Sequence, residues 1–174
     1  MTDPIVLRPL DHTRIRQAFP LVQSVLPGTT LPRWTSFARS YASEGKGRSA
    51  SGIMAVENQS GYIVGLFTHE ARDELAHGQT LSIGNLLIAD FPGREQAMAY
   101  VIDIIETMAN LRGCDAIVVD LDVAFSGEPP TCAWSIPVFE RRGFHAVGPS
   151  QCRKPLRVRR PGLALAVADR MPQG

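Results

Sequence analysis

The sequence has few cysteines, no excess charge of either sign and no long hydrophobic run. Three cysteines occur among 174 residues, and an odd number excludes a complete set of disulfides within one chain. We therefore expect reduced thiols, which are typical of a cytoplasmic protein. Neither the cysteines nor the four histidines have the spacing of a zinc site, so we expect no metal.

The charge balance and the hydropathy also exclude several kinds of partner. There are 18 Lys and Arg against 17 Asp and Glu, whereas a dedicated nucleic-acid binder is normally clearly basic. No apolar run approaches the ~20 residues that a membrane helix needs. The N-terminus lacks the basic and apolar regions of a signal peptide. We expect no membrane partner and no nucleic-acid partner.

The sequence does have enough apolar residues for a large core. Hydrophobic residues make up 44% of the chain, and a domain of this length buries roughly 70% of the surface that its unfolded form exposes. We expect one domain over residues 1–156, followed by a C-terminal tail over 157–174 whose role is unknown. No repeat or low-complexity tract divides the chain.

Hydrophobic periodicity and turn residues predict the order of elements. A strand at 5–10 precedes a helix that starts after Asp11 and is kinked or shortened at Pro20, and a second helix covers 32–41. Strands at 53–57 and 62–68 form a hairpin, the polar segment 72–79 is a turn, and 80–89 is a strand with a bulge at Gly84–Asn85. A long helix contains the apolar stripe from Ala97 to Leu111. The last predicted elements are a strand at 116–121, a short helix at 135–142, and strands at 144–147 and 152–156.

This order predicts a mixed α/β (α+β) domain with one mostly antiparallel sheet flanked by helices. Two of its segments point to a binding site. Ser82–Met98 is a strand that runs through Pro92–Gly93 into a helix start, and the free amides of a helix start favour anions such as phosphate. An ordinary strand–turn–helix connection has the same pattern, so this segment alone does not decide between them.

The second segment is Cys132–Phe144, and together the two resemble the GCN5-related N-acetyltransferase (GNAT) superfamily. The closing motif of that family is similar to Asn-x-x-Ala-x-x-Leu-Tyr-Glu-x-x-Gly-Phe. Here the matching positions are Cys132, Ser135, Val138, Phe139, Glu140, Gly143 and Phe144. The segment Ser82–Asp90 resembles the family's fourth strand, and the similarity extends over residues 5–156.

The resemblance implies an acyl coenzyme A cosubstrate, with acetyl-CoA as the usual one. Its pantetheine arm would pair with the fourth strand at Leu86, Leu87 and Ile88, where a backbone amide would polarise the thioester carbonyl. Its pyrophosphate would contact the helix start at Gly93, Arg94, Glu95, Gln96, Ala97 and Met98. Cys132, Ser135 and Phe139 would complete the coenzyme site through the closing motif.

The sequence departs from the family at the positions that handle protons and phosphate. Gly84 replaces the frequent general base, and Phe139 replaces the tyrosine that protonates the leaving thiolate. Glu95 introduces a carboxylate into the phosphate loop, where it would repel the ligand. Glu70 and Ser82 are the remaining candidates for catalysis, although Ser82 is no base near pH 7 and a surface position at a strand end is the simpler explanation of Glu70.

Two functions therefore stay open at this point. The first is an acyl-CoA-dependent N-acyltransferase that acts on a small-molecule or peptide amine by direct attack on the thioester. The alternative is a catalytically degenerate member that binds acyl-CoA as a sensor or acts as an interaction module. Neither the acceptor nor the oligomeric state, including a homodimer, can be read from the sequence.

Overall fold

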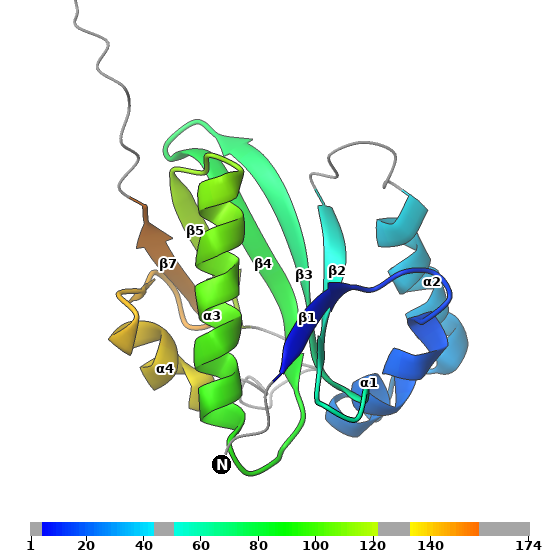
Figure 1. The fold of residues 1–174 in the computed structure, drawn as a ribbon. Helices are drawn as coiled ribbons and strands as arrows, with labels where there is room; N and C mark the ends of the chain where they lie inside the picture. Colours follow the sequence, from blue (N-terminus) through cyan, green and yellow to red (C-terminus); the bar gives the residue numbers. More distant parts are fainter. Residues whose placement is uncertain (1–4, 44–50, 122–132, 157–174) are drawn as a thin grey trace, which may run out of the picture.

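The computed structural model describes residues 5–43, 51–121 and 133–156 (Figure 1). Its elements, in chain order, are β1 (Val6–Pro9), the 3-10 helix η1 (Ile15–Ala18), α1 (Phe19–Val25), α2 (Leu31–Ser43), β2 (Ser51–Glu57), β3 (Ile63–Glu74), β4 (Gly78–Ile88), α3 (Arg94–Leu111), β5 (Ala116–Asp120), the 3-10 helix η2 (Ala133–Ser135), α4 (Ile136–Arg141), β6 (His145–Ala146) and β7 (Gln151–Pro155). The predicted tail at 157–174 and Cys132 lie outside the described residues.

All seven strands belong to one sheet, in the order β1-β2-β3-β4-β5-β7-β6. Every neighbouring pair is antiparallel except β4 and β5, which are parallel and are joined through α3. A parallel pair needs such a crossover, because its strands must start at the same edge of the sheet. The predicted fold class, a mixed and mostly antiparallel sheet with flanking helices, is confirmed.

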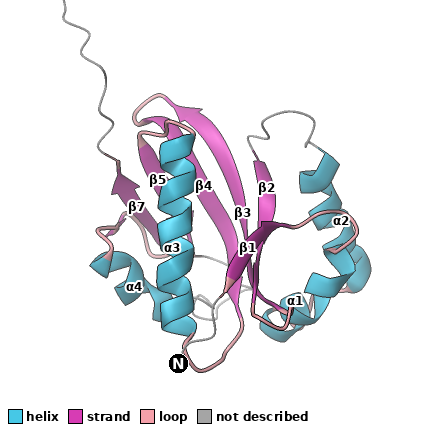
Figure 2. Cartoon of the chain, viewed as in Figure 1, coloured by secondary structure: helices cyan, strands magenta, loops and turns pink. Residues whose placement is uncertain are grey.

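The sheet separates two hydrophobic cores (Figure 2). Along β3, Phe67 packs with the residues of α3 and α4, whereas its neighbour Leu66 packs with those of α1 and α2. In β2, Val56 and Ala55 divide between the same two cores. This alternation follows from the two-residue period of a strand and shows that the central strands are buried on both faces.

The prediction of a turn over the polar segment 72–79 is wrong. β3 continues to Glu74 and β4 begins at Gly78, and the backbone pairing includes Arg72 with Thr80. The turn is confined to the residues between Glu74 and Gly78, where Gly78 adopts a positive φ of 68°. The segment is polar because this end of the hairpin is largely exposed, and exposure does not prevent backbone pairing.

The helix predicted to start after Asp11 begins later. The Oδ1 of Asp11 accepts hydrogen bonds from the amides of Thr13 and Arg14, at 2.8 and 3.2 Å, and this turn leads into η1. The α-helix itself starts at Phe19, with Pro20 in its first turn. Proline lacks an amide hydrogen, so it fits at the start of a helix and not in its middle.

Candidate functional site

The edge of β4 becomes open where β5 diverges from it. β4 and β5 pair from Thr80–Ala116 to Ile83–Val119. β5 then ends at Asp120, while β4 continues to Ile88. Among the described strands, β4 has only β3 as a partner beyond Ile83. The other edge of β4 therefore has no strand partner among the described residues beyond Ile83.

A bulge in β4 lies at the point of divergence, as the sequence predicts. Leu66 pairs with Leu87 and Thr68 pairs with Gly84, so two residues of β4 oppose one residue of β3. Asn85 adopts a positive φ of 47°, and its Nδ2 donates to the Oγ1 of Thr68 at 3.2 Å. A bulge bends the strand and changes the direction of the residues that follow.

The amide of Ile88 points toward the open edge. The amide of Ala89 donates to the carbonyl of Val64 at 2.8 Å, on the β3 side. Successive backbone groups of a strand point in opposite directions, so the Ile88 amide faces away from β3. The side chains of Leu86 and Ile88 are buried in the core beneath α3, and Leu87 is buried on the opposite face. Ile88 therefore contributes its backbone, rather than its side chain, to the open edge, whereas the backbone of Leu87 faces β3 by the same alternation.

The start of α3 presents free amides next to this edge. Gly93 precedes the helix in a left-handed conformation, with φ at 91°. The amide of Arg94 donates to Phe91 and that of Ala97 to Gly93, whereas those of Glu95 and Gln96 have no backbone acceptor among the described residues. Free amides and the helix dipole give this end a partial positive charge.

The remaining predicted phosphate-loop residues divide between core and surface. Ala97 and Met98 are buried in the protein core, so only their backbone can reach a ligand. Glu95 extends toward α4, where its carboxylate lies 3.6 Å from the guanidinium of Arg141. Both of those side chains are more than 60% exposed, so solvent weakens the pair.

Arg94 is held against two neighbours at the start of α3. Its Nη1 donates to the Oδ1 of Asp90 at 2.6 Å, and its guanidinium lies 4.5 Å from the ring centroid of Trp134. The second contact links α3 to η2 across a long stretch of sequence. The sequence predicts Arg94 as a phosphate contact, but it gives no signal for Trp134, because only the tertiary structure brings the two together.

The closing-motif residues form the packing between α4 and the sheet. Phe139 and Ser135 are completely buried. The ring of Phe139 meets that of Phe144 edge-on, at a centroid distance of 5.1 Å. Phe139 thus has no exposed surface, and its part in the coenzyme site stays a prediction.

The two catalytic candidates lie opposite each other. Glu70 of β3 pairs with Ser82 of β4, and both lie on the same face as Thr68 and Gly84, two residues closer to the hairpin. The Oε2 of Glu70 accepts a hydrogen bond from the Nη2 of Arg72 at 2.5 Å. This ion pair gives Glu70 a structural partner.

His69, which precedes Glu70 in β3, has a pKa far from its ordinary value. It is buried, and burial together with the nearby charge of Arg112 lowers its pKa to about 4. The Nη1 of Arg112 lies 3.2 Å from its Nδ1. Because a guanidinium can only donate, Nδ1 is the acceptor and the imidazole proton resides on Nε2.

Other chemistry is sparse in the described part of the chain. No three His, Cys, Asp or Glu side chains gather there as a metal site would require. None of the helices described is long and apolar enough to span a membrane. Cys114 and Cys152 are free and buried, and burial raises the pKa of both thiols, so neither is an activated nucleophile.

Solved structures that superpose on this chain include several N-acetyltransferases. Glucosamine-6-phosphate N-acetyltransferase from Arabidopsis thaliana superposes with a TM-score of 0.62 at 16% identity, over 84% of this chain and 95% of that one. The aminoglycoside N-acetyltransferase AAC(6')-Iy, in complex with CoA, gives 0.62 at 14% identity, over 84% and 91%. The NatC complex bound to Gag peptide and CoA gives 0.57 at 16% identity, over 87% and 98%.

This chain has the GNAT fold. The fold implied by the resemblance in sequence is thereby confirmed. The sequence identities are too low to infer the substrate of this chain from these structures. No protein-family model matches the chain, and no curated protein matches its sequence.

Proposed function

We propose that this chain is an acyl-CoA-dependent N-acyltransferase of the GNAT superfamily that uses acetyl-CoA to acylate a small-molecule or peptide amine. The observation that supports it most is the open edge of β4 beyond Ile83, next to free amides at the start of α3. An extended pantetheine arm has amides that can pair with such an edge. Two of the similar structures are bound to CoA, in keeping with this cosubstrate.

The described residues have distinct roles in this proposal. The amides at the start of α3 and the guanidinium of Arg94 bind the pyrophosphate. The amide of Ile88 donates to the thioester carbonyl and stabilises the negative charge that develops on its oxygen. Cys132, which belongs to the same predicted coenzyme site, lies outside the described residues.

In the transfer step, the amine nitrogen forms a bond to the carbonyl carbon while the carbon–sulfur bond breaks. The amine proton leaves and the thiolate of CoA gains a proton. Phe139 has no hydroxyl to supply it, and Gly84 provides no base. We infer that water or the substrate handles these protons, so that positioning and carbonyl polarisation provide the rate enhancement. General acid–base catalysis typically contributes 10²–10⁴-fold, so its absence predicts slow transfer.

Calorimetric titration with acetyl-CoA and with CoA tests the binding part of the proposal. We expect both to bind, and Arg94→Gln to weaken binding about 10-fold because it removes a charge-assisted contact. Arg8→Gln is the matched control, since Arg8 is exposed on β1 and remote from α3. An unchanged affinity in Arg94→Gln would contradict the phosphate site at α3.

A second candidate function is a GNAT-fold protein that binds acyl-CoA without transferring the acyl group. The phenylalanine at position 139 favours it, because no proton donor occupies that position. A thiol-release assay over a panel of amines and peptides separates the two. Tight acetyl-CoA binding with no release above the rate in buffer supports the second function, and release that depends on the amine supports the first.

A further inference from the structure

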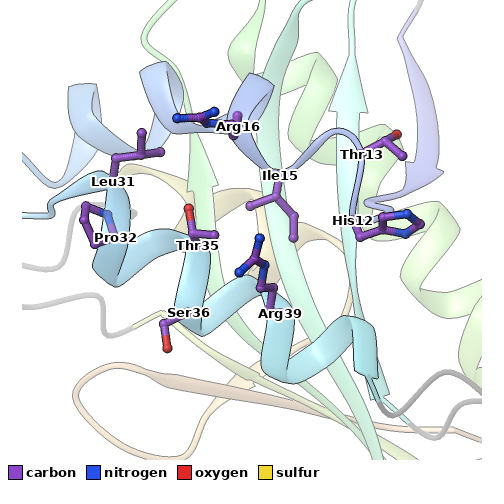
Figure 3. Close-up of a pocket in the computed structure, with 9 residues that line it drawn as sticks. All are labelled: His12, Thr13, Ile15, Arg16, Leu31, Pro32, Thr35, Ser36 and Arg39. Atoms are coloured by element: carbon purple, nitrogen blue, oxygen red, sulfur yellow. The ribbon is translucent and has the colours of Figure 1, made fainter.

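A cavity of about 650 Å³ lies between η1 and α2 (Figure 3). Its lining residues come only from the segment around η1 and from α2. They are His12, Thr13, Ile15, Arg16, Leu31, Pro32, Thr35, Ser36 and Arg39. The cavity therefore shares no residue with the acyl-CoA site proposed above.

The segment that forms this cavity is basic. Residues 12–43 contain four arginines and no aspartate or glutamate. Arg14 forms an ion pair with Glu57 of β2. By contrast, Arg16 and Arg39 are exposed and form no ion pair with any residue that the structure describes. Two uncompensated guanidinium groups thus lie on the wall of one cavity.

The two guanidinium groups reach the cavity from different elements. Figure 3 shows Arg16 on the η1 side and Arg39 and Thr35 on the α2 side, with the side chain of Ile15 between them. Ser36 points away from this space. The Nε1 of Trp34 donates to the carbonyl of Ile15 at 2.7 Å, and both residues are buried. This bond connects η1 to α2 and fixes the two sides of the cavity relative to each other.

We propose that this cavity binds a phosphate monoester that has an apolar substituent. The three terminal oxygens of a phosphate can accept from Arg16 on one side and from Arg39 and the Thr35 hydroxyl on the other. A carboxylate has only two oxygens and one negative charge, so it matches the two guanidinium groups and the hydroxyl less completely than a phosphate monoester, which has three terminal oxygens and a charge of about −2. Leu31 and Pro32 provide accessible apolar surface for the substituent.

Titration with phenyl phosphate, followed by amide NMR, tests this site in the full chain. We expect chemical-shift changes in the amides of residues 12–16 and 31–39. Benzoate and phenol are the matched probes, because they keep the ring and change only the charged group. Both should bind at least about 10-fold more weakly, as each lacks part of the charge-assisted contacts. Equal affinities for the three probes would overturn the proposal.

Two variants locate the charged groups. Arg16→Gln and Arg39→Gln should each weaken phenyl phosphate binding about 10-fold. Arg33→Gln is the control, since Arg33 is on the same helix but does not line the cavity, and it should change the affinity less than about twofold. Because all three side chains are exposed, we expect every variant to fold, as circular dichroism would verify. An equal loss in Arg33→Gln, or shift changes located at α3, would overturn the assignment to this cavity.

Discussion

At the scale of single residues, the amide of Ile88 is the most specific element of the proposed transfer site. Ile88→Pro removes this amide without removing a hydrogen bond to β3, because the amide faces the open edge. We expect acetyl transfer to fall about 10²–10³-fold, the usual effect of losing one oxyanion donor. Steady-state kinetics on the folded variant would measure it.

Ile88→Ala is the control for this experiment. It loses the same buried side chain and keeps the amide, so we expect it to be less stable but to retain transfer within about 10-fold. If the alanine variant lost as much activity as the proline variant, packing rather than the amide would be responsible.

Glu95 is the residue whose charge opposes coenzyme binding. Removing the carboxylate in Glu95→Gln should raise the affinity for CoA, because a like charge near the pyrophosphate is lost. The free energy of unfolding should fall by about 0.3–1 kcal/mol, since a carboxylate in the first helical turn interacts favourably with the dipole. Calorimetric titrations should therefore show a higher affinity for CoA in Glu95→Gln than in wild type, and thermal melts should show a lower Tm.

Arg141→Gln provides the comparison for Glu95. It breaks the same exposed ion pair but leaves the carboxylate in place, so CoA affinity should not rise. A tighter complex in this variant would mean that the ion pair, rather than the Glu95 charge, limits binding.

At the scale of secondary-structure elements, the bulge of β4 depends on the left-handed backbone of Asn85. Asparagine tolerates this conformation and alanine does not, at a cost of roughly 1–2 kcal/mol. We therefore expect Asn85→Ala to be less stable than Asn85→Gly by about that amount, since both lose the bond to Thr68 and only alanine keeps the strain. Equal stabilities in urea unfolding would show that the side-chain bond, not the backbone, determines the cost.

His69 couples β3 to the end of α3 and gives the fold a pH dependence. Its pKa of about 4 in the folded chain lies below the ordinary value of 6.5, so the unfolded chain binds the proton more readily. The contribution of neutral His69 to the free energy of unfolding is therefore fully present above pH 6.5. It declines as the pH falls toward 4, by up to roughly 1.4 kcal/mol per pH unit. Urea unfolding of wild type and His69→Gln between pH 7.5 and 4 would measure the difference. Identical pH slopes in the two proteins would contradict this role of His69.

At the scale of the whole molecule, ligand binding should stabilise the fold as a unit. The proposed acyl-CoA site joins β4 with the start of α3, so binding connects the two ends of the crossover. At a concentration 100 times the dissociation constant, acetyl-CoA should add about 2.7 kcal/mol to the free energy of unfolding. For a domain of this size that is a rise in Tm of about 5–10 °C, which differential scanning fluorimetry detects. The absence of any shift at saturation would exclude acetyl-CoA as a ligand.

The sequence by itself determined the features that depend on neighbouring residues. The apolar stripe from Ala97 to Leu111 predicted α3, and Gly84–Asn85 predicted the bulge, because local backbone preferences and periodicity act over a few residues. The Glu140–Phe144 motif supported the fold class. A polar stretch of sequence indicates that its side chains are exposed, but it does not show whether its backbone pairs with another strand. For this reason the polar end of the β3–β4 hairpin was predicted as a turn.

Only the tertiary structure decided which distant segments meet. It placed Trp134 against Arg94, Ser82 opposite Glu70, and Arg16 across a cavity from Arg39. It also determined that β5 leaves β4 after Ile83. The physical reason is that strand register and contacts between elements depend on how the whole chain packs its two cores, and a two-residue or 3.6-residue period specifies which face is buried but not what covers it.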